Sequence, residues 1–316
     1  MPKEKKVLLL GGVILDRYYE VARYPHAGQD AIIDRAYDKV GGCCLNVAIT
    51  LNNLGIAPHI VSRLGDDEIG RQILAYINGI PLPSDCLTVQ TGASTGYCLT
   101  ILDASGERTF LTYAGIEKTF ASEAIAPAMQ GAPDFVYVTG YYLLRQDTAA
   151  RVLHSLRQMQ QTGCPILFDP GPLVGEIAPQ QLEEMIRLAS VMTPNQHEMQ
   201  TIQARLGLVG DAIASLLQMS VQQLVLKNGA QGSIVYTKDG QINVPSLPVS
   251  ALDSTGAGDS FAGGLIASLL QGKGIADAVG FASACGAYTA TVAGPHAFFT
   301  QPEIIKFINE HKEVSP

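Results

Sequence analysis

The heptapeptide DSTGAGD at 253–259 constrains this chain most strongly, and it runs directly into an apolar, helix-like stretch at 260–270. Glycine adopts backbone conformations in which a Cβ would clash, so Gly256 and Gly258 allow a tight loop at the start of a helix. Backbone N–H groups converge at a helix N-terminus, where the helix dipole is positive. The stretch therefore predicts an anion-binding turn.

Asp259 ends this turn with a carboxylate. A carboxylate placed there could take a proton from a hydroxyl group whose oxygen then attacks a phosphorus atom. Phosphoryl transfer depends mainly on positioning and charge stabilisation, and one such turn could supply both. The alternative is a purely structural turn, because Asp is a favoured helix cap and glycine-rich turns are common.

Composition limits the classes of partner. The chain has 316 residues, 47% of them hydrophobic, which is enough for a large buried core. Its net charge of −8 argues against nucleic acid or an anionic membrane as a partner, since both are bound through excess Lys and Arg. No apolar run approaches the ~20 residues of a membrane helix. We expect a cytoplasmic protein whose anionic ligands are held by local groups.

The six cysteines show no CxxC and no metal-ligand spacing, so we interpret them as reduced thiols in the core. For the adjacent pair Cys43-Cys44, a redox switch is the alternative.

Apolar runs alternate with helical patterns along most of the chain. Residues 7–12 form an apolar run that ends in two glycines, typical of a buried parallel strand that opens into a ligand-binding loop. Alternation of strands with helices of ten or more residues indicates a doubly wound, mostly parallel sheet flanked by helices, an α/β fold. Further strands are predicted at 135–139, 166–168 and 191–193, with helices at 148–161 and 179–189 between them.

Two segments do not follow this alternation. Residues 13–40 mix short β-prone pieces with Pro, Gly and charged residues, and 95–100 with 107–113 have the pattern of a β-hairpin. We expect them to form a small β-sheet lid. The domain prediction is a single domain over 1–316, with a lid from about 13–40 and 93–115 inserted in the α/β core.

The heptapeptide resembles the D-[ST]-x-G-A-G-D signature of the ribokinase-like (PfkB) carbohydrate kinases. Residues 41–46, GGCCLN, resemble the second signature of that family, G-G-x-x-x-N. Shorter matches follow in the same order, and the resemblance extends from Gly11 to Gly294. It implies the ribokinase-like fold and ATP-dependent phosphorylation of a hydroxymethyl group on a small sugar, by in-line transfer of the γ-phosphoryl group.

The resemblance also implies roles for individual residues. Asp259 would be the general base, and the N–H groups of the preceding turn would form the anion hole. The sugar would be held near Asp16 and at the start of the helix that follows the second signature. The residues concerned are Gly256, Ala257 and Gly258 for the anion hole, and Asp16, Gly42 and Asn46 for the sugar.

For the nucleotide and the ions, the resemblance implies a second set. ATP is the co-substrate, and Lys227 stands where the family usually has Thr. Glu198, in a match to the N-x-x-E motif, would bind Mg²⁺ through water. A K⁺ ion is expected at a loop near the heptapeptide. The nucleotide residues are Asn195, Lys227, Gly229 and Gly232, and the K⁺ residues are Asp253, Thr255 and Gly294.

The chain departs from the family pattern in two places. Cys43-Cys44 replaces the Lys-Gly common in ribokinase-type members, which argues against assuming ribose as the substrate. The stretch 169–173 reads DPGPL where many members read D-x-N-x-R, leaving Asp169 as either a structural turn or a contact to metal-bound water.

Several functions remain open at this point. A nucleoside kinase of the same family is the nearest alternative, and a non-catalytic nucleotide-binding regulator is the alternative from another class. A dinucleotide-dependent oxidoreductase is disfavoured because residues 10–15 lack the spaced third glycine of G-x-G-x-x-G. The family also suggests a homodimer formed through the lid.

Overall fold

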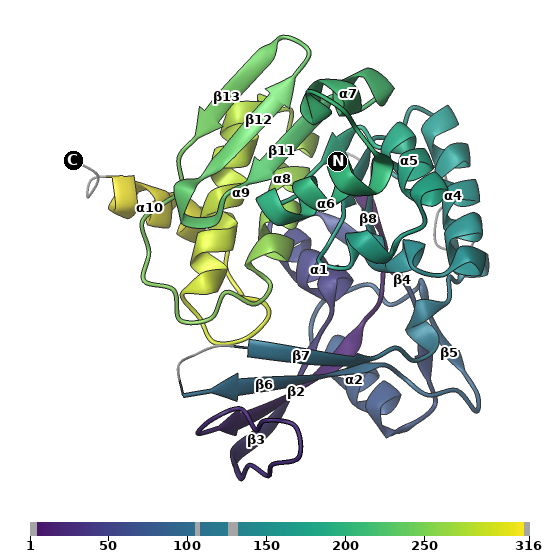
Figure 1. Cartoon of the computed structure of the whole chain (residues 1–316), viewed down its shortest axis with the longest axis vertical. Coiled ribbons are helices and arrows are strands. Elements are labelled where there is room, and N and C mark those ends of the chain that lie inside the picture. Colours follow the sequence, from purple (N-terminus) through teal and green to yellow (C-terminus); the bar gives the residue numbers. More distant parts are fainter. Residues whose placement is uncertain (1–4, 105–107, 126–131, 313–316) are drawn as a thin grey trace.

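The computed structural model describes residues 5–104, 108–125 and 132–312. Its centre is a nine-stranded sheet with strand order β13-β12-β11-β10-β9-β8-β1-β4-β5 (Figure 1). All neighbours pair in parallel except at the β12 and β13 edge, where pairing is antiparallel. The strands are β1 (Lys6–Leu10), β4 (Ala57–Gly65), β5 (Leu87–Gln90), β8 (Phe135–Thr139), β9 (Ile166–Asp169), β10 (Val191–Met192), β11 (Gln223–Lys227), β12 (Ser233–Thr237) and β13 (Gly240–Val244).

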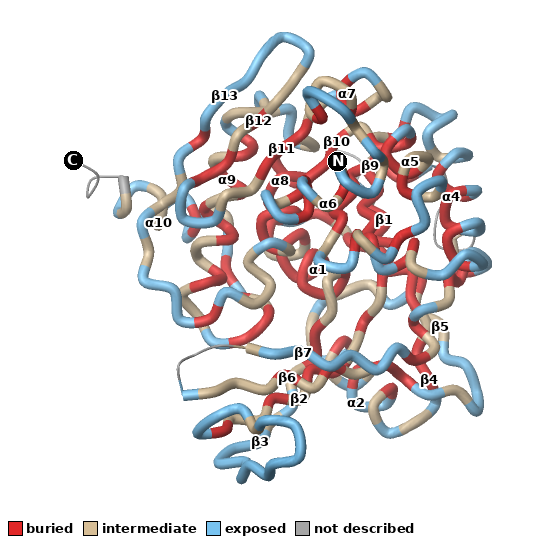
Figure 2. The backbone as a smooth tube through the Cα atoms, viewed as in Figure 1, coloured by how far each residue is buried: buried red, intermediate tan, exposed pale blue. Residues whose placement is uncertain are grey.

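Helices cover both faces of this sheet, each over its own apolar cluster. One cluster joins the sheet to α1 (Cys43–Asn53), α2 (Glu68–Asn78), α8 (Ala257–Leu270), α9 (Ile275–Ala290) and α10 (Gln301–Lys312). The other joins it to α4 (Gln146–Gln161), α5 (Pro179–Leu188), α6 (Gln196–Leu206) and α7 (Ala212–Met219). The buried tube segments of Figure 2 follow this layering. The α/β, doubly wound prediction is therefore confirmed.

Strand β1 shows why the continuous apolar run in the sequence indicated a buried parallel strand. Val7, Leu8, Leu9 and Leu10 in β1 are all fully buried, because β1 has a parallel neighbour on each side and helices over both faces. Apolar residues are therefore needed at every position, not only at alternate ones.

A second, four-stranded sheet lies beside the core, in the order β3-β2-β6-β7 (Figure 1). Its strands are β2 (Ile14–Val21), β3 (Ile33–Gly41), β6 (Tyr97–Asp103) and β7 (Arg108–Tyr113). β6 and β7 are antiparallel, as the hairpin pattern predicted, and β2 runs parallel to β6. We call this sheet the lid.

Two differences from the expected boundaries affect the candidate site. The helix expected at 260–270 begins earlier, at Ala257, which places Asp259 inside its first turn. Asp16 lies within lid strand β2 and not in a loop after β1, because the chain returns to extended structure at Ile14. In the described part of the chain, no helix is both long and apolar enough to cross a membrane. The six cysteines are free thiols, five of them buried, as expected.

Candidate active site

Chain elements far apart in sequence meet where the parallel strands end. Asp169 is the last residue of β9 and Lys227 the last of β11, so both lie at the carboxyl edge of the sheet, where α/β folds bind ligands. The α8 N-terminus reaches the same place, because a Cβ built on Gly258 would lie 3.8 Å from the Lys227 Nζ. The heptapeptide thus faces a strand-end ammonium group.

The position directly before α8, occupied by Gly256, requires glycine. Gly256 has φ +72°, and a Cβ there would lie 1.7 Å from the Pro295 carbonyl oxygen. Within the described residues, no acceptor is found for the N–H groups of Gly256 and Gly258. The Ala257 N–H differs from expectation, since it donates to the Ser254 carbonyl at 3.2 Å and an anion would have to compete for it.

The Asp259 carboxylate is held by a neutral donor. Asn46 of α1 donates from Nδ2 to its Oδ2 at 2.7 Å. Burial raises the pKa of Asp259 to about 7, with the negative charge of Asp169 adding to the effect, while the Asn46 hydrogen bond and the Lys227 charge act to lower it. A carboxylate with a pKa near 7 is well matched to proton abstraction at neutral pH.

Lys227 and Asp169 form a buried ion pair. The ammonium nitrogen lies 3.3 and 3.4 Å from the two carboxylate oxygens of Asp169. Burial acts to lower the pKa of Lys227, but the carboxylates of Asp169 and Glu198 outweigh it and the pKa is raised. Lys227 is therefore a permanent positive charge beside Gly258. The sequence left Asp169 undecided, and its partner is 58 positions away.

Asn195 and Glu198 begin α6 as a reciprocal capping box. The Asn195 side chain accepts the Glu198 N–H at 2.8 Å, and Glu198 Oε2 accepts the Asn195 N–H at 2.9 Å. Asn195 also forms an isolated bridge with Lys227, so this turn adjoins the ion pair. Glu198 is only 5% exposed. Both side chains therefore have a structural function in addition to any ligand contact.

The glycines of the loop after β11 have conformational reasons of their own. Gly229 and Gly232 have φ of +55° and +87°, and a Cβ on Gly232 would lie 2.3 Å from the Val244 carbonyl oxygen. The loop connects β11 to antiparallel β12. It places the backbone next to Lys227.

The predicted sugar residues lie on the lid side of α1. Asp16 is 9% exposed, and burial raises its pKa to about 7, opposed by the charge of Lys39. Its carboxylate packs on Gly41, where a Cβ would lie 2.2 Å from Oδ2. Gly42 has φ +98°, and a Cβ there would lie 2.7 Å from the Gly12 carbonyl oxygen. Asn46 differs from expectation, because its amide nitrogen already bonds to Asp259.

Tyr141 is a candidate site residue that the sequence did not reveal. It lies in the 3₁₀ turn Gly140–Leu143 that follows β8. Burial raises its pKa, and Cys43, Asp259 and Asp16 are among the groups whose charge adds to the increase. The Tyr141 hydroxyl is therefore within electrostatic range of the base and of Asp16.

The expected K⁺ loop already contains positive side chains. The Asp253 carboxylate accepts the N–H groups of Thr255 and Gly294, each at 3.0 Å. It also pairs with Arg108 of lid strand β7 at 2.9 Å. The Lys39 ammonium lies 2.7 Å from the position of a Cβ on Gly294. Two cations therefore compete with K⁺ for this negative region.

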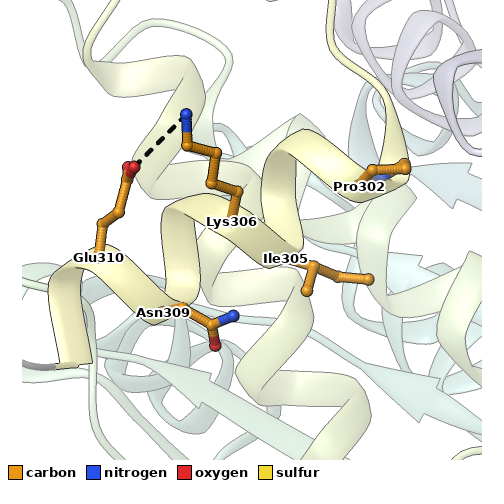
Figure 3. A pocket seen from close by; sticks show the side chains of 5 residues that line it. All are labelled: Pro302, Ile305, Lys306, Asn309 and Glu310. Carbon is orange, nitrogen blue, oxygen red and sulfur yellow. Dashed lines mark ion pairs between the residues drawn. The ribbon is translucent and has the colours of Figure 1, made fainter.

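A separate surface hollow lies on the C-terminal helix α10 (Figure 3). Lys306 and Glu310 form an ion pair of 3.6 Å along it. It contains none of the site residues predicted from the sequence. Its lining is Pro302, Ile305, Lys306, Asn309 and Glu310.

Comparison with known proteins identifies one family. The model of the pfkB family carbohydrate kinases matches residues 4–301. Among relatives, the ATP-dependent ribose-1-phosphate kinase of Halopiger xanaduensis is 28% identical over 306 residues, covering 96% of this chain and 98% of that protein. Fructokinase-1 of Oryza sativa is 27% identical, covering 97% of this chain and 98% of its own length.

Solved structures agree on the fold. The fructokinase of Xylella fastidiosa with bound ATP aligns with a TM-score of 0.84 at 24% identity, covering 98% of this chain and 99% of that one. The nucleoside kinase of Burkholderia thailandensis in complex with inosine aligns with a TM-score of 0.83 at 21% identity, over 98% and 100% of the two chains. At these identities the likeness shows the ribokinase fold alone.

Proposed function

Because the chain belongs to the pfkB family of carbohydrate kinases, we propose that it transfers the γ-phosphoryl group of ATP to a hydroxymethyl group of a small sugar. The observation that carries the proposal is the Asp259 carboxylate in the first turn of α8, beside the glycine amides and the Lys227 ammonium.

Asp259 acts as the general base. Asn46 donates to its Oδ2, the Cys43 thiol is a second hydrogen-bond partner, and the carboxylate accepts the proton of the sugar hydroxyl. The hydroxyl oxygen forms the new bond to the γ-phosphorus while the bond from that phosphorus to the ADP oxygen breaks in line. The N–H groups of Gly256 and Gly258 stabilise the charge that develops on the transferred group, since amides oriented in advance need no reorganisation.

Lys227 supports the same step from beside the glycine amides. Its ammonium lies next to Gly258 and offers a full charge to a phosphate oxygen. Asn195, Gly229 and Gly232 line the turns beside it, where the nucleotide binds. Glu198, a buried carboxylate near Lys227, fits a Mg²⁺ site reached through water, because Mg²⁺ prefers oxygen ligands and keeps several waters. Bound Mg²⁺ would neutralise charge on the phosphates.

K⁺ has no part in this mechanism. Arg108 and Lys39 already bring positive charge to the loop of Asp253, Thr255 and Gly294. We therefore expect a monovalent cation to be dispensable, although the family resemblance suggests one.

A sugar is favoured over a nucleoside as the acceptor. Four tyrosines of the lid are stacked on one another and not free to stack on a base: Tyr18 on Tyr37 with centroids 5.0 Å apart, and Tyr97 on Tyr113 at 5.2 Å. Asp16 and Gly42 offer hydrogen-bonding groups to hydroxyls. Tyr141 would cover the sugar ring.

The lid also supports a homodimer. Edge strand β7 exposes Phe110, Leu111 and Tyr113 by about half each, and Ile33 of edge strand β3 is 47% exposed. Burying such side chains against a second copy is favourable. Light scattering of the wild type and of Phe110→Asp tests this, with a dimer expected only for the wild type.

A panel assay tests the proposed function. ADP release is measured with Mg²⁺-ATP and separate pentoses, hexoses and nucleosides. We expect kcat/KM for at least one sugar to exceed that for every nucleoside by tenfold or more. A preference for nucleosides would support the alternative kinase, and ATP binding without turnover across the panel would support the regulator.

A further inference from the structure

A chain of three side chains leads from Asp259 away from the site. Asn46 of α1 contacts Asp259, and its Oδ1 lies 3.2 Å from Nδ1 of His296, in the loop that precedes α10. The other ring nitrogen, Nε2, lies 2.5 Å from the hydroxyl of Tyr76 in α2. Hydrogen bonds thus link α1, the loop before α10 and α2, in that order, to the base. In the described part of the chain, Asn46 is the proposed ligand-binding residue to which this pair is hydrogen-bonded.

Donor and acceptor chemistry allows only one direction along this chain. An ionised Asp259 can only accept, so Asn46 must turn its NH₂ group toward it. The Asn46 oxygen then faces His296 and needs a donor, which places the ring proton on Nδ1. In the neutral ring with its proton on Nδ1, the Nε2 atom accepts the Tyr76 O–H. Each group donates toward the carboxylate.

We infer that His296 and Tyr76 are positioning residues that fix the Asn46 amide with its nitrogen toward Asp259. This inference rests on the proposed role of Asp259 as the base. Rotating the Asn46 amide by half a turn would set its oxygen against the carboxylate, and nothing in the covalent structure prevents this. His296 and Tyr76 exclude that rotamer, because it would also leave the His296 N–H facing an NH₂ group.

The positioning has a direct effect on the base. The amide holds Oδ2 of Asp259 and so fixes the orientation of the carboxylate that is to meet the sugar hydroxyl. Asn46 is 3% exposed, so water does not easily replace a lost partner. Other groups that bear on Asp259 are Asp169 at the end of β9, Lys227 at the end of β11, and Cys43 of α1. Among the described residues, no hydrogen bond or ion pair joins these three to His296 or Tyr76, so we expect their influence on Asp259 to be unchanged when Tyr76 is substituted.

The substitution Tyr76→Phe cuts the chain with the smallest change, since it removes one oxygen and keeps the ring. Without that donor, His296 can move its proton to Nε2 and then repels the Asn46 oxygen. We expect kcat to fall roughly 5- to 30-fold, the effect of one misplaced hydrogen bond to a charged group. KM for ATP should stay within about twofold. The acid limb of kcat/KM should move to higher pH, because the Asn46 bond that lowers the pKa of Asp259 is weakened.

Tyr142→Phe is the matched control. The Tyr142 hydroxyl donates to the Val61 carbonyl at 2.9 Å in the other apolar cluster, so this variant loses one buried hydrogen bond away from the base. It should melt at a lower temperature but keep the wild-type kcat and pH profile. At His296, Gln can still donate to Asn46 and Leu cannot, so His296→Gln should retain more activity than His296→Leu.

Wild-type kcat and an unmoved pH limb in Tyr76→Phe would overturn the inference, as would equal losses in Tyr76→Phe and Tyr142→Phe. If the His296 variants do not fold, the comparison of Tyr76→Phe with Tyr142→Phe still tests the inference. A separate result would contradict the proposed function: full activity of Asp259→Asn would show that Asp259 is not the base. An inactive Asp259→Asn together with an unaffected Tyr76→Phe removes only the positioning role.

Discussion

Two aspartates at the same edge of the molecule differ in what faces them. Asp169 at the end of β9 lies 3.3 Å from an ammonium group, whereas Asp259 in the first turn of α8 accepts an amide N–H at 2.7 Å. Burial raises the pKa of both carboxyl groups; at Asp169 the charge and hydrogen bond of Lys227 oppose that rise, whereas the closest donor to Asp259, whose pKa is raised to about 7, is a neutral amide. The same side chain thus serves as the counter-ion of Lys227 in one place and as a group that titrates near pH 7 in the other.

The comparison divides the site into a base half and a phosphate half. The base half contains Asp259, Asn46 and the two positioning residues, all linked by neutral donors. The phosphate half contains Lys227, Asp169 and Glu198, linked by charge. Proton transfer needs a group that can change its charge, and phosphate binding needs one that does not.

The largest expected effect is on the phosphate half, from Lys227→Met. It removes the charge beside Gly258 and leaves Asp169 buried without a partner. We expect kcat/KM for ATP to fall about 10²- to 10³-fold, since a charge at the transferring group contributes several kcal/mol. Steady-state kinetics at varied ATP measure it. Lys238→Met, an exposed lysine between β12 and β13, is the control and should behave as wild type. A fall of less than fivefold for Lys227→Met would contradict the assignment.

A double-mutant cycle sharpens the role of Asp169. Asp169→Asn alone should lower kcat/KM by about tenfold, because Lys227 loses its orientation. The double variant Asp169→Asn with Lys227→Met should be more stable than Lys227→Met alone, since no unpaired buried charge remains. Thermal unfolding of the four proteins gives the coupling, and additive changes in melting temperature would show that the pair is not coupled.

Asp259→Asn should stabilise the protein in a pH-dependent way. The pKa of Asp259 is raised to about 7, so stability is fully present below the ordinary pKa and is lost as pH rises through about 7. At pH 8 the variant should melt about 2 °C above wild type, and at pH 5 the difference should shrink. Scanning calorimetry at both values measures this. A variant less stable than wild type at pH 8 would mean that Asp259 is held by charge, like Asp169.

The smallest expected effect is that of K⁺. Because Arg108 pairs with Asp253 and Lys39 lies beside Gly294, wild-type activity should change by less than about twofold when K⁺ replaces Na⁺ at constant ionic strength. Arg108→Ala removes one competing charge and should respond more strongly to K⁺. Strong activation of the wild type by K⁺ would show that a specific ion binds despite both side chains.

The sequence predicted the individual parts well, because each depends on local chemistry. The heptapeptide indicated that a helix, α8, follows it, and the apolar run at 135–139 has the same bounds as β8. The earlier start of α8, at Ala257, was missed because Gly256 caps the helix through a positive φ and no capping side chain is involved.

The contacts between parts could not be predicted from the sequence. Asn46 and Asp259 are 213 positions apart, and Asn46 and His296 are 250 apart. A polar residue in an apolar helix indicated that Asn46 needs partners but not which ones, so its amide was assigned to the sugar. His296 had no motif around it, and only the folded chain brings it to the base.

The pH dependence of kcat/KM between pH 5 and 9, at low concentrations of sugar and ATP, tests the central claim most directly. The base works only when deprotonated, so activity should rise with pH through about 7 and then level off. Asp16 also has a pKa of about 7, and Asp16→Asn should therefore leave a shallower limb that reports Asp259 alone. A profile of Asp16→Asn that is flat from pH 5 to 8 would contradict the account, because an acid with an ordinary pKa, or none, would then be the base.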